Sequence, residues 1–283
     1  MSLFRLEFLR VCRSATYIAA VTALVLIAYF QNVFPPAARI VAPGGAAEGL
    51  EACALLAEDY ALARDVDRFS GAHARLFASR VGAALAVLCP FPAAALFWRD
   101  RRACRAAVYA RGVSSMRFVL CRAAALTAAM FLPVAVMALT LTSVAATDYG
   151  LANIDILAYG KYALFWLMPT ILLCTAIGAL PAALTGLPLG PLAALLWGWT
   201  ARDAPAFDYA SLLAPRHEAL GETARFLENA GALARSRLAA VLLGAALLAL
   251  TALAVEWKRR GRESVAPLPG AGRAGNGKGR PEP

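Results

Sequence analysis

Five uncharged stretches alternate along the chain with segments that hold all of its charged residues. They cover residues 14–38, 81–98, 123–147, 162–201 and 238–255. A charged side chain at the centre of a bilayer costs about 2.5–3.5 kcal/mol, and about 20 apolar residues are needed to cross the hydrocarbon core. Each of these stretches is therefore predicted to contain at least one membrane-spanning helix.

The fourth stretch is 40 residues long, twice the length that one crossing requires. Its interior offers a turn at Pro and Gly positions, namely Pro181, Gly186, Pro188, Gly190 and Pro191. We therefore expect two helices joined by a tight hairpin, and six spans in total. The predicted fold class is an all-α polytopic membrane protein, with a six-span domain over residues 1–260 and approximate spans at 15–34, 81–98, 123–146, 162–180, 183–200 and 238–256.

The first apolar stretch has one alternative interpretation, a secretory signal peptide, because Arg5, Arg10 and Arg13 precede it. The segment before Tyr17 is amphipathic and longer than the basic region of a usual signal peptide. No small-x-small cleavage site follows the apolar run directly. We therefore expect an uncleaved span with an amphipathic lead-in.

Basic residues are concentrated in three segments that would lie on one side of the membrane. The N-terminus holds three arginines, residues 99–122 hold seven arginines against one acid, and the tail from Lys258 holds seven basic residues against two acids. The other side is balanced, with five arginines and six acids in residues 34–80 and five charges of each sign in residues 201–237. Cytoplasmic loops carry the excess of Lys and Arg. Both termini are therefore predicted to be cytoplasmic.

Composition supports the membrane class and excludes several others. Hydrophobic residues make up 60% of the chain and charged residues only 16%, whereas soluble domains have about 45–50% and about 25%. This excludes an ordinary cytosolic enzyme and a disordered chain. The six cysteines form no C-x-x-C motif and no evident disulfide framework, and two histidines are too few for a metal site of usual spacing. The many Ala, Arg and Gly residues are typical of a GC-rich bacterial genome.

Two segments on the predicted outer side are long enough to carry structure. Residues 49–69 and 218–237 interleave apolar and charged positions, which favours interfacial or lid-like helices, and the second runs into the last span. Both segments could equally serve only to shield the helix ends. Residues 264–283 are rich in Pro and Gly and are predicted to be a disordered cytoplasmic tail.

Candidate enzymatic chemistry is weak throughout the chain. Residues 272–279 read GRAGNGKG, which is close to a Walker A loop, but Gly279 stands where a Ser or Thr would bind magnesium. We expect no ATP hydrolysis, no catalytic residue and no bound cofactor in this chain. The predicted spans also lack Asp, Glu and His at mid-depth, which disfavours an ion-coupled carrier. The energy source is therefore expected on another protein.

The segment between the second and third spans is the most informative one. It reads as a short helix over residues 100–111 that is broken at Gly112 and re-enters the membrane after Arg122. Cys104 and Val108 share one helix face with Ala107. Such a helix could dock into a groove on a soluble partner. Alternatively, it is an ordinary positive-inside loop that also attracts anionic lipid.

The topology and this loop together resemble the permease subunits of ABC-2 type transporters. That family typically shows an acid at the membrane exit, Gly-Thr and Glu on the helix, then Pro-x-Ser and a Lys before the third span. The matching positions here are Asp100, Val108, Ser115, Val119, Leu120 and, near the lysine, Arg122. The departures are Cys104 and Arg105 for Gly-Thr, Ala107 for Glu, and Val113 for Pro.

The resemblance implies the transmembrane subunit of an ATP-driven exporter in a bacterial inner membrane. Its partners would be a separate cytoplasmic ATPase, a second permease copy and membrane lipid, with no role for nucleic acid. The residues implied to couple the chain to the ATPase, within the cytoplasmic loop 99–122, are Asp100, Arg101, Cys104, Arg105, Val108 and Ser115. The rival hypotheses are a non-transporting membrane scaffold or biogenesis factor and, third, an ion-coupled carrier.

Overall fold

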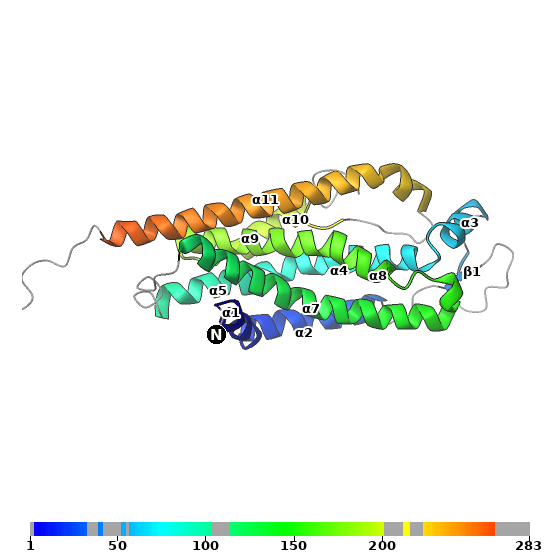
Figure 1. The fold of residues 1–283 in the computed structure, drawn as a ribbon, viewed down its shortest axis with the longest axis horizontal. Coiled ribbons are helices and arrows are strands. Elements are labelled where there is room, and N and C mark those ends of the chain that lie inside the picture. The colour runs from blue at the N-terminus through cyan, green and yellow to red at the C-terminus, as the bar shows by residue number, and fades with distance from the viewer. Residues whose placement is uncertain are drawn as a thin grey trace, which may run out of the picture.

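The computed structural model describes residues 3–32, 39–41, 52–54, 57–103, 114–200, 212–215 and 223–263. Within them the chain forms an elongated bundle of helices (Figure 1). The elements are α1 (Leu3–Cys12), α2 (Ala15–Asn32), β1 (Arg39–Val41), β2 (Ala52–Ala54), α3 (Ala57–Asp65), α4 (Ser70–Leu88), α5 (Pro90–Ala103), α7 (Ser115–Tyr149), η1 (Leu151–Asn153), α8 (Ala158–Tyr162), the π-helical η2 (Ala163–Leu167), α9 (Met168–Thr185), α10 (Gly190–Thr200) and α11 (Thr223–Glu263).

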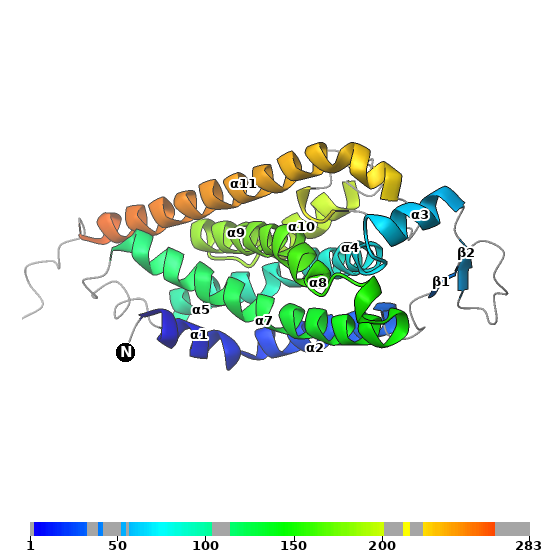
Figure 2. The same cartoon turned by 45° about the vertical axis from the view of Figure 1, so that its right-hand side comes forward.

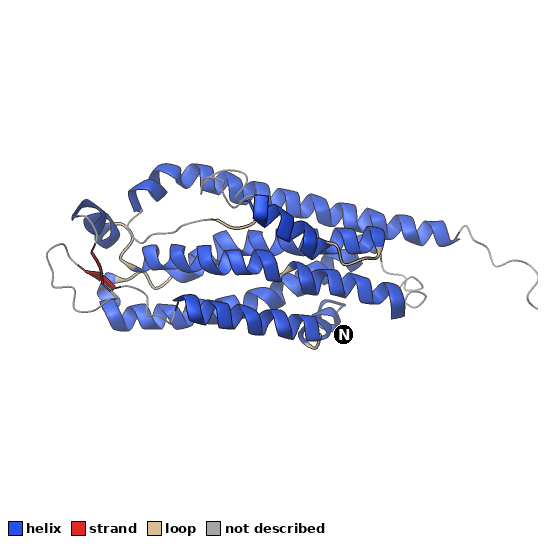
Figure 3. Cartoon of the chain, turned by 180° about the vertical axis from the view of Figure 1, so that it is seen from behind, coloured by secondary structure: helices blue, strands red, loops and turns tan. Residues whose placement is uncertain are grey.

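The two ends of the bundle differ in the elements that they carry. One end holds α1, the last turn of α5, the first turn of α7 and the last turns of α11 (Figure 2). We call it the basic end, because these elements belong to or border the three basic segments of the sequence. The opposite end holds α3 and the short parallel pair β1–β2, in which Ile40 lies across from Cys53 (Figure 3). The loop 99–122 thus starts and finishes at the basic end.

Four of the described helical segments are long and apolar enough to cross a membrane: Ser70–Trp98, Ser115–Tyr149, Ala158–Thr185 and Thr223–Arg260. A fifth is added if the bent pair of α1 and α2 counts as one span. These segments contain the predicted spans at 81–98, 123–146, 162–180 and 238–256, and each helix extends beyond its predicted span at one end or both. The fold is therefore all-helical apart from one small strand pair, with four to five candidate spans.

The predicted amphipathic lead-in is the separate helix α1, which meets α2 at an angle of 65°. The break lies at Ser14, whose hydroxyl accepts a hydrogen bond from the Tyr17 amide at 3.2 Å. A serine in this position satisfies one of the amides that a helix start leaves open. Helix α2 is tied to α7 by the Tyr17 hydroxyl, which donates to the Ala129 carbonyl at 3.0 Å.

The predicted hairpin after α9 is present, and its turn lies at residues 186–189. Gly186 has a left-handed φ of 75° and ends α9, while Pro181 stays inside that helix. Helix α10 has 11 residues and so is about 17 Å long, whereas the hydrocarbon core is about 30 Å thick. The predicted start of the fifth span, 183–200, was therefore wrong, because residues 183–185 belong to α9 and the next helix starts only at Gly190. A crossing by α10 stays a prediction, since residues 201–211 lie outside the described part of the chain.

Two glycines allow three helices to meet at the centre of the bundle. A Cβ on Gly190 of α10 would lie 2.5 Å from the Gly178 Cα of α9. A Cβ on Gly178 would lie 2.7 Å from the Pro90 carbonyl oxygen of α5. Small residues permit such close helix contacts in membrane proteins, where dispersion packing drives helix association. These two positions therefore set how closely α10 and α5 can approach α9.

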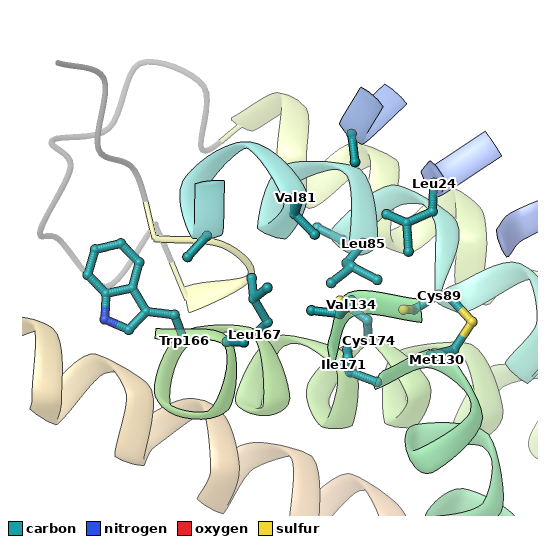
Figure 4. Close-up of a cluster of buried hydrophobic side chains, with 14 of the residues drawn as sticks. Leu24, Val81, Leu85, Cys89, Met130, Val134, Trp166, Leu167, Ile171 and Cys174 are labelled. Atoms are coloured by element: carbon teal, nitrogen blue, oxygen red, sulfur yellow. The ribbon is translucent and has the colours of Figure 1, made fainter. Parts of the chain in front are cut away.

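The interior of the bundle is filled by apolar side chains from α2, α4, α7 and α9 (Figure 4). Leu85 of α4, Val134 of α7 and Ile171 of α9 are each fully buried within it. Burial of side chains of this size stabilises a fold by about 1.5–3 kcal/mol each in water, although lipid reduces the transfer term. The core holds α4, α7 and α9 as one packed unit.

The two predicted outer segments differ in outcome. The helix expected over residues 218–237 is the first part of α11, which starts at Thr223 and continues without a break into the last span. The helix expected over residues 49–69 covers only Ala57–Asp65. It is shorter because Ala52–Ala54 pairs with Arg39–Val41 as a strand instead. The predicted tail at 264–283, including the GRAGNGKG segment, lies outside the described residues.

Candidate functional site

Three of the six predicted coupling residues lie in the described part of the chain, and all three are at the basic end. Asp100 and Arg101 are on the last turn of α5, which extends past the membrane exit to Ala103. Cys104, Arg105 and Val108 fall in residues 104–113, outside the described part of the chain. Ser115 is the first residue of α7, and Ser114 caps that helix by accepting a hydrogen bond from the Arg117 amide.

Ser115 joins the start of α7 to the last turns of α11. Its residue is 4% exposed, and its hydroxyl donates to the Glu256 carboxylate at 2.5 Å. The same hydroxyl accepts from the Arg259 guanidinium at 3.1 Å, and Arg260 donates to the other Glu256 oxygen at 3.2 Å. The Ser115 side chain is therefore held inside this chain by α11, and its contact with an ATPase stays a prediction.

Helix α11 is also attached to the end of α9 at this place. The Lys258 ammonium donates to the carbonyl oxygens of Ala183 and Leu184, in the last turn of α9. The last carbonyls of a helix lack intrahelical partners and carry partial negative charge, so a lysine there is favourable. The end of α9 and the start of α7 are thus both fixed to the same two turns of α11.

A buried ion pair links α7 to the N-terminal helix α1. The Arg122 guanidinium donates to both oxygens of the Glu7 carboxylate, at 3.1 and 3.2 Å. The Arg122 side chain is 1% exposed and that of Glu7 is 8% exposed. The guanidinium also lies 4.3 Å from the ring centroid of Phe118 and 5.3 Å from that of Phe97. This pair connects α1 to α7 close to the point where the loop 99–122 ends.

Arg122 was counted among the loop arginines that indicate the cytoplasmic side, but its charge is used inside the protein. The sequence carries no local signal for this, because Glu7 is 115 residues away along the chain. The only hint is that a single acid, Glu7, stands among three N-terminal arginines. Six arginines remain in the predicted cytoplasmic loop when Arg122 is left out, and the orientation stays a prediction.

A second buried polar cluster lies at the opposite end of the bundle. The Arg75 guanidinium on α4 binds both oxygens of Asp67, at 2.8 and 2.5 Å. It also donates to the Thr223 hydroxyl at 3.0 Å, and Thr223 donates to Asp67 at 2.7 Å. The guanidinium lies 4.4 Å from the centroid of the Phe226 ring. Thr223 and Phe226 belong to α11, so the cluster attaches α11 to α4, and we interpret it as structural.

Two further contacts bind the loops at the opposite end. His73 Nε2 lies 2.9 Å from the Tyr149 hydroxyl, which accepts from the Ile40 amide at 3.0 Å. Asp155 accepts from the Lys161 ammonium at 2.6 Å. That hydrogen bond is the main cause that lowers the pKa of Asp155 below its ordinary value. Sequence reasoning missed Arg75 and His73 because it started the second span at residue 81, beyond both.

The described polar side chains at the basic end bind mainly to one another and to backbone carbonyls of this chain. Among the described residues, no three His, Cys, Asp or Glu side chains are grouped so that they could hold a metal ion. The Ser115 hydroxyl contacts both Glu256 and Arg259, which joins the start of α7 to the last turns of α11. Comparisons with protein-family models, with curated proteins and with solved structures find no match to this chain.

Proposed function

We propose that this chain is the transmembrane subunit of an ATP-driven exporter of the ABC-2 type in a bacterial inner membrane. In this proposal a separate cytoplasmic ATPase hydrolyses ATP and binds the loop 99–122. The segment Arg99 to Arg111 acts as the coupling helix. The resemblance of the loop and of the span order to ABC-2 permeases is the starting point, and the geometry at the basic end adds physical support.

The observation that carries the proposal is the way the loop's end is attached to the rest of the bundle. Ser115 and Arg122 lie seven residues, or about 10 Å, apart on α7. Ser115 is bound to α11 and Arg122 to α1. A displacement of the loop would therefore move α7 together with α1 and α11. A partner that closes on ATP can shift the equilibrium of the spans only through contacts that differ between its open and closed states. The connection of the loop to α1 and α11 would carry that difference into the spans.

The filled interior indicates where a path for cargo would form. Leu85, Val134 and Ile171 are fully buried between α4, α7 and α9, so this part of the bundle is packed. Large apolar side chains on the outside of α7, such as Val136 and Leu139, are 56% and 73% exposed. We therefore place the path between this chain and a second permease copy. In such an assembly two permease copies bind two ATPase subunits.

The test compares two substitutions in the loop by recovery of the ATPase with the tagged full-length chain. Val108→Asp places a charge on the docking face, where it would lose water without gaining a partner, at a cost of several kcal/mol. ATPase recovery should fall strongly while membrane insertion stays normal, since the loop lies outside the hydrocarbon region. Arg101→Ala removes a rim charge that contributes about 0–1 kcal/mol, so recovery should be almost unchanged.

The competing interpretations give different results in the same experiment. If the loop only binds anionic lipid, arginine removals weaken surface association by about 1 kcal/mol each, and Val108→Asp has no special effect. Full ATPase recovery by the Val108→Asp variant would contradict the coupling helix. If the unsubstituted chain recovers no ATPase at all, the scaffold or biogenesis hypothesis is favoured instead.

A further inference from the structure

A strained backbone turn joins α3 to α4 at the opposite end of the bundle (Figure 2). Arg68 has a φ of 48° and Phe69 a φ of 53°, and they are the two described non-glycine residues with a positive φ. In an L-residue such backbone brings the Cβ atom too close to a neighbouring carbonyl oxygen. For a bulky residue such as phenylalanine it is a genuine outlier. Strain of this kind is concentrated at functional sites and in switch regions.

The hydrogen bonding around Phe69 shows which kind of turn this is. Its ψ is −44°, and the Ser70 amide donates to the Arg68 carbonyl, two residues back. A positive φ, a negative ψ and this hydrogen bond together describe a γ-turn of the rare and strained form. Glycine has no Cβ and adopts positive φ values at no steric cost. The strain therefore comes from the side chains at residues 68 and 69, and glycine at either position would reduce it.

The strained turn is held between two sets of contacts. On one side, Asp67 binds the Arg75 guanidinium and the Thr223 hydroxyl, which attaches the turn to α4 and α11. On the other side, the Ser70 hydroxyl donates to the Asp155 carbonyl at 3.1 Å and accepts from the Asp155 amide at 2.8 Å. Asp155 lies in the segment between η1 and α8. The turn therefore connects α4, α11 and the segment before α8.

The Phe69 side chain keeps the backbone in its strained conformation. It is 7% exposed and stacks on the Tyr149 ring, with centroids 5.0 Å apart and an angle of 17° between the two planes. The Tyr60 ring of α3 lies against it, with centroids 5.7 Å apart. Burial of a phenylalanine side chain and strain at one or two residues are of similar size in free energy. The strained turn is therefore held only as long as this ring stays packed.

We propose that residues 67–70 form a latch that closes the opposite end of the bundle and opens by relaxing its backbone strain. In the open state Phe69 leaves Tyr149, the γ-turn relaxes, and the contacts of Asp67 and Ser70 are lost. Because the strain is present only in the closed state, opening is easier than it would be with glycine in the turn. In an exporter this is the end at which cargo leaves. That role rests on the proposed function, whereas the latch itself requires neither the ATPase nor transport.

Hydrogen–deuterium exchange of the purified full-length chain in detergent measures how often the latch opens. In the closed state the Phe69 amide donates to the Ala63 carbonyl at 2.8 Å, and the Gly71 amide donates to the Asp67 carbonyl at 3.0 Å. Arg68→Gly relieves strain in the closed state and should slow exchange of these two amides about fivefold. Arg68→Ala is the matched control, because it removes the same guanidinium but keeps the Cβ. Its exchange should stay within about twofold of that of the unsubstituted chain.

A second pair of variants covers the case that Arg68 contributes in another way. Phe69→Ala and Phe69→Gly both remove the ring, so exchange in both should be faster than in the unsubstituted chain. In ordinary backbone glycine is the less stable residue of the two. Here the order should be inverted, and Phe69→Gly should exchange about fivefold more slowly than Phe69→Ala. If glycine protects these amides no better than alanine at both positions, the latch carries no strain and the proposal is wrong.

The link between the latch and α11 is tested in the same data. Because Asp67 binds Thr223, Phe69→Ala should also speed exchange at the start of α11, over residues 226–229. Exchange in α9, which has no contact with the latch residues among the hydrogen bonds given above, should stay unchanged. Faster exchange confined to residues 67–71, or spread equally over α9, would overturn the proposal.

Discussion

The buried pair between Glu7 and Arg122 gives the sharpest prediction on stability. Both side chains are almost fully buried, and two hydrogen bonds join them. Removing one member leaves the other charge buried without its partner, which typically costs about 3–5 kcal/mol. Glu7→Leu and Arg122→Met, like Glu7→Gln and Arg122→Gln, should each destabilise the chain by an amount in this range.

The double variant should behave differently from the two single ones. Replacing a buried ion pair by apolar residues of similar volume is often neutral or even stabilising. Glu7→Leu combined with Arg122→Met should therefore lie within about 1 kcal/mol of the unsubstituted chain. The non-additivity expected for this cycle, more than about 3 kcal/mol, would show direct coupling between α1 and α7.

Arg10 supplies the matched control on the same helix. Its guanidinium lies 4.0 Å from Glu7, and its side chain is 40% exposed. Arg10→Ala should change stability by no more than about 1 kcal/mol, since exposed pairs contribute little. The assay is equilibrium unfolding in mixed micelles followed by tryptophan fluorescence, with a thermal shift as an independent ranking. If Glu7→Gln has no larger effect than Arg10→Ala, this pair does not hold α1 to α7. A displacement of the loop would then not be passed from α7 to α1.

The other predictions concern packing, pH and orientation. Gly178→Ala should lower the melting temperature clearly because the new methyl group would meet backbone atoms, whereas Gly198→Ala, which would meet no described atom within 4 Å, should not. The lowered pKa of Asp155 means that its carboxylate stabilises the fold above about pH 4 and that this contribution is lost as the pH falls through the lowered value. Asp155→Asn should remove that acid-dependent loss, measured as melting temperature against pH. Reporter fusions should place residue 110 in the cytoplasm and residue 58 outside, and a cytoplasmic residue 58 would contradict the six-span topology.

Uncharged windows located the centres of four helices but missed their ends. The second span was predicted to start at residue 81, yet α4 starts at Ser70. Arg75 lies in that first part of the helix, and its charge is matched by Asp67. A hydropathy argument treats every arginine as exposed to its surroundings, so it cannot recognise one that a distant carboxylate neutralises. The same limit explains why Arg122 was assigned to the loop.

The hairpin after α9 could be predicted from the sequence, whereas the π-helical turn before α9 could not. The Pro and Gly positions after α9 do mark a turn, because Gly186 adopts the left-handed conformation that ends a helix. The π-helical turn over Ala163–Leu167, just before Pro169, and the position of α11 beside α9 were not predicted. Neither a backbone irregularity nor the neighbour of a helix can be derived from spacing along one sequence. The predicted coupling residues 104–108 lie outside the described part of the chain.

The central claim is that a separate ATPase drives this chain through the loop at the basic end. The most direct measurement is cross-linking with mass spectrometry on the tagged, unsubstituted chain extracted from its native membranes. We expect that an ATPase is recovered with the chain and that its cross-links map to residues 99–111. Recovery without any ATPase, or an ATPase whose cross-links map only to other segments, would contradict the account.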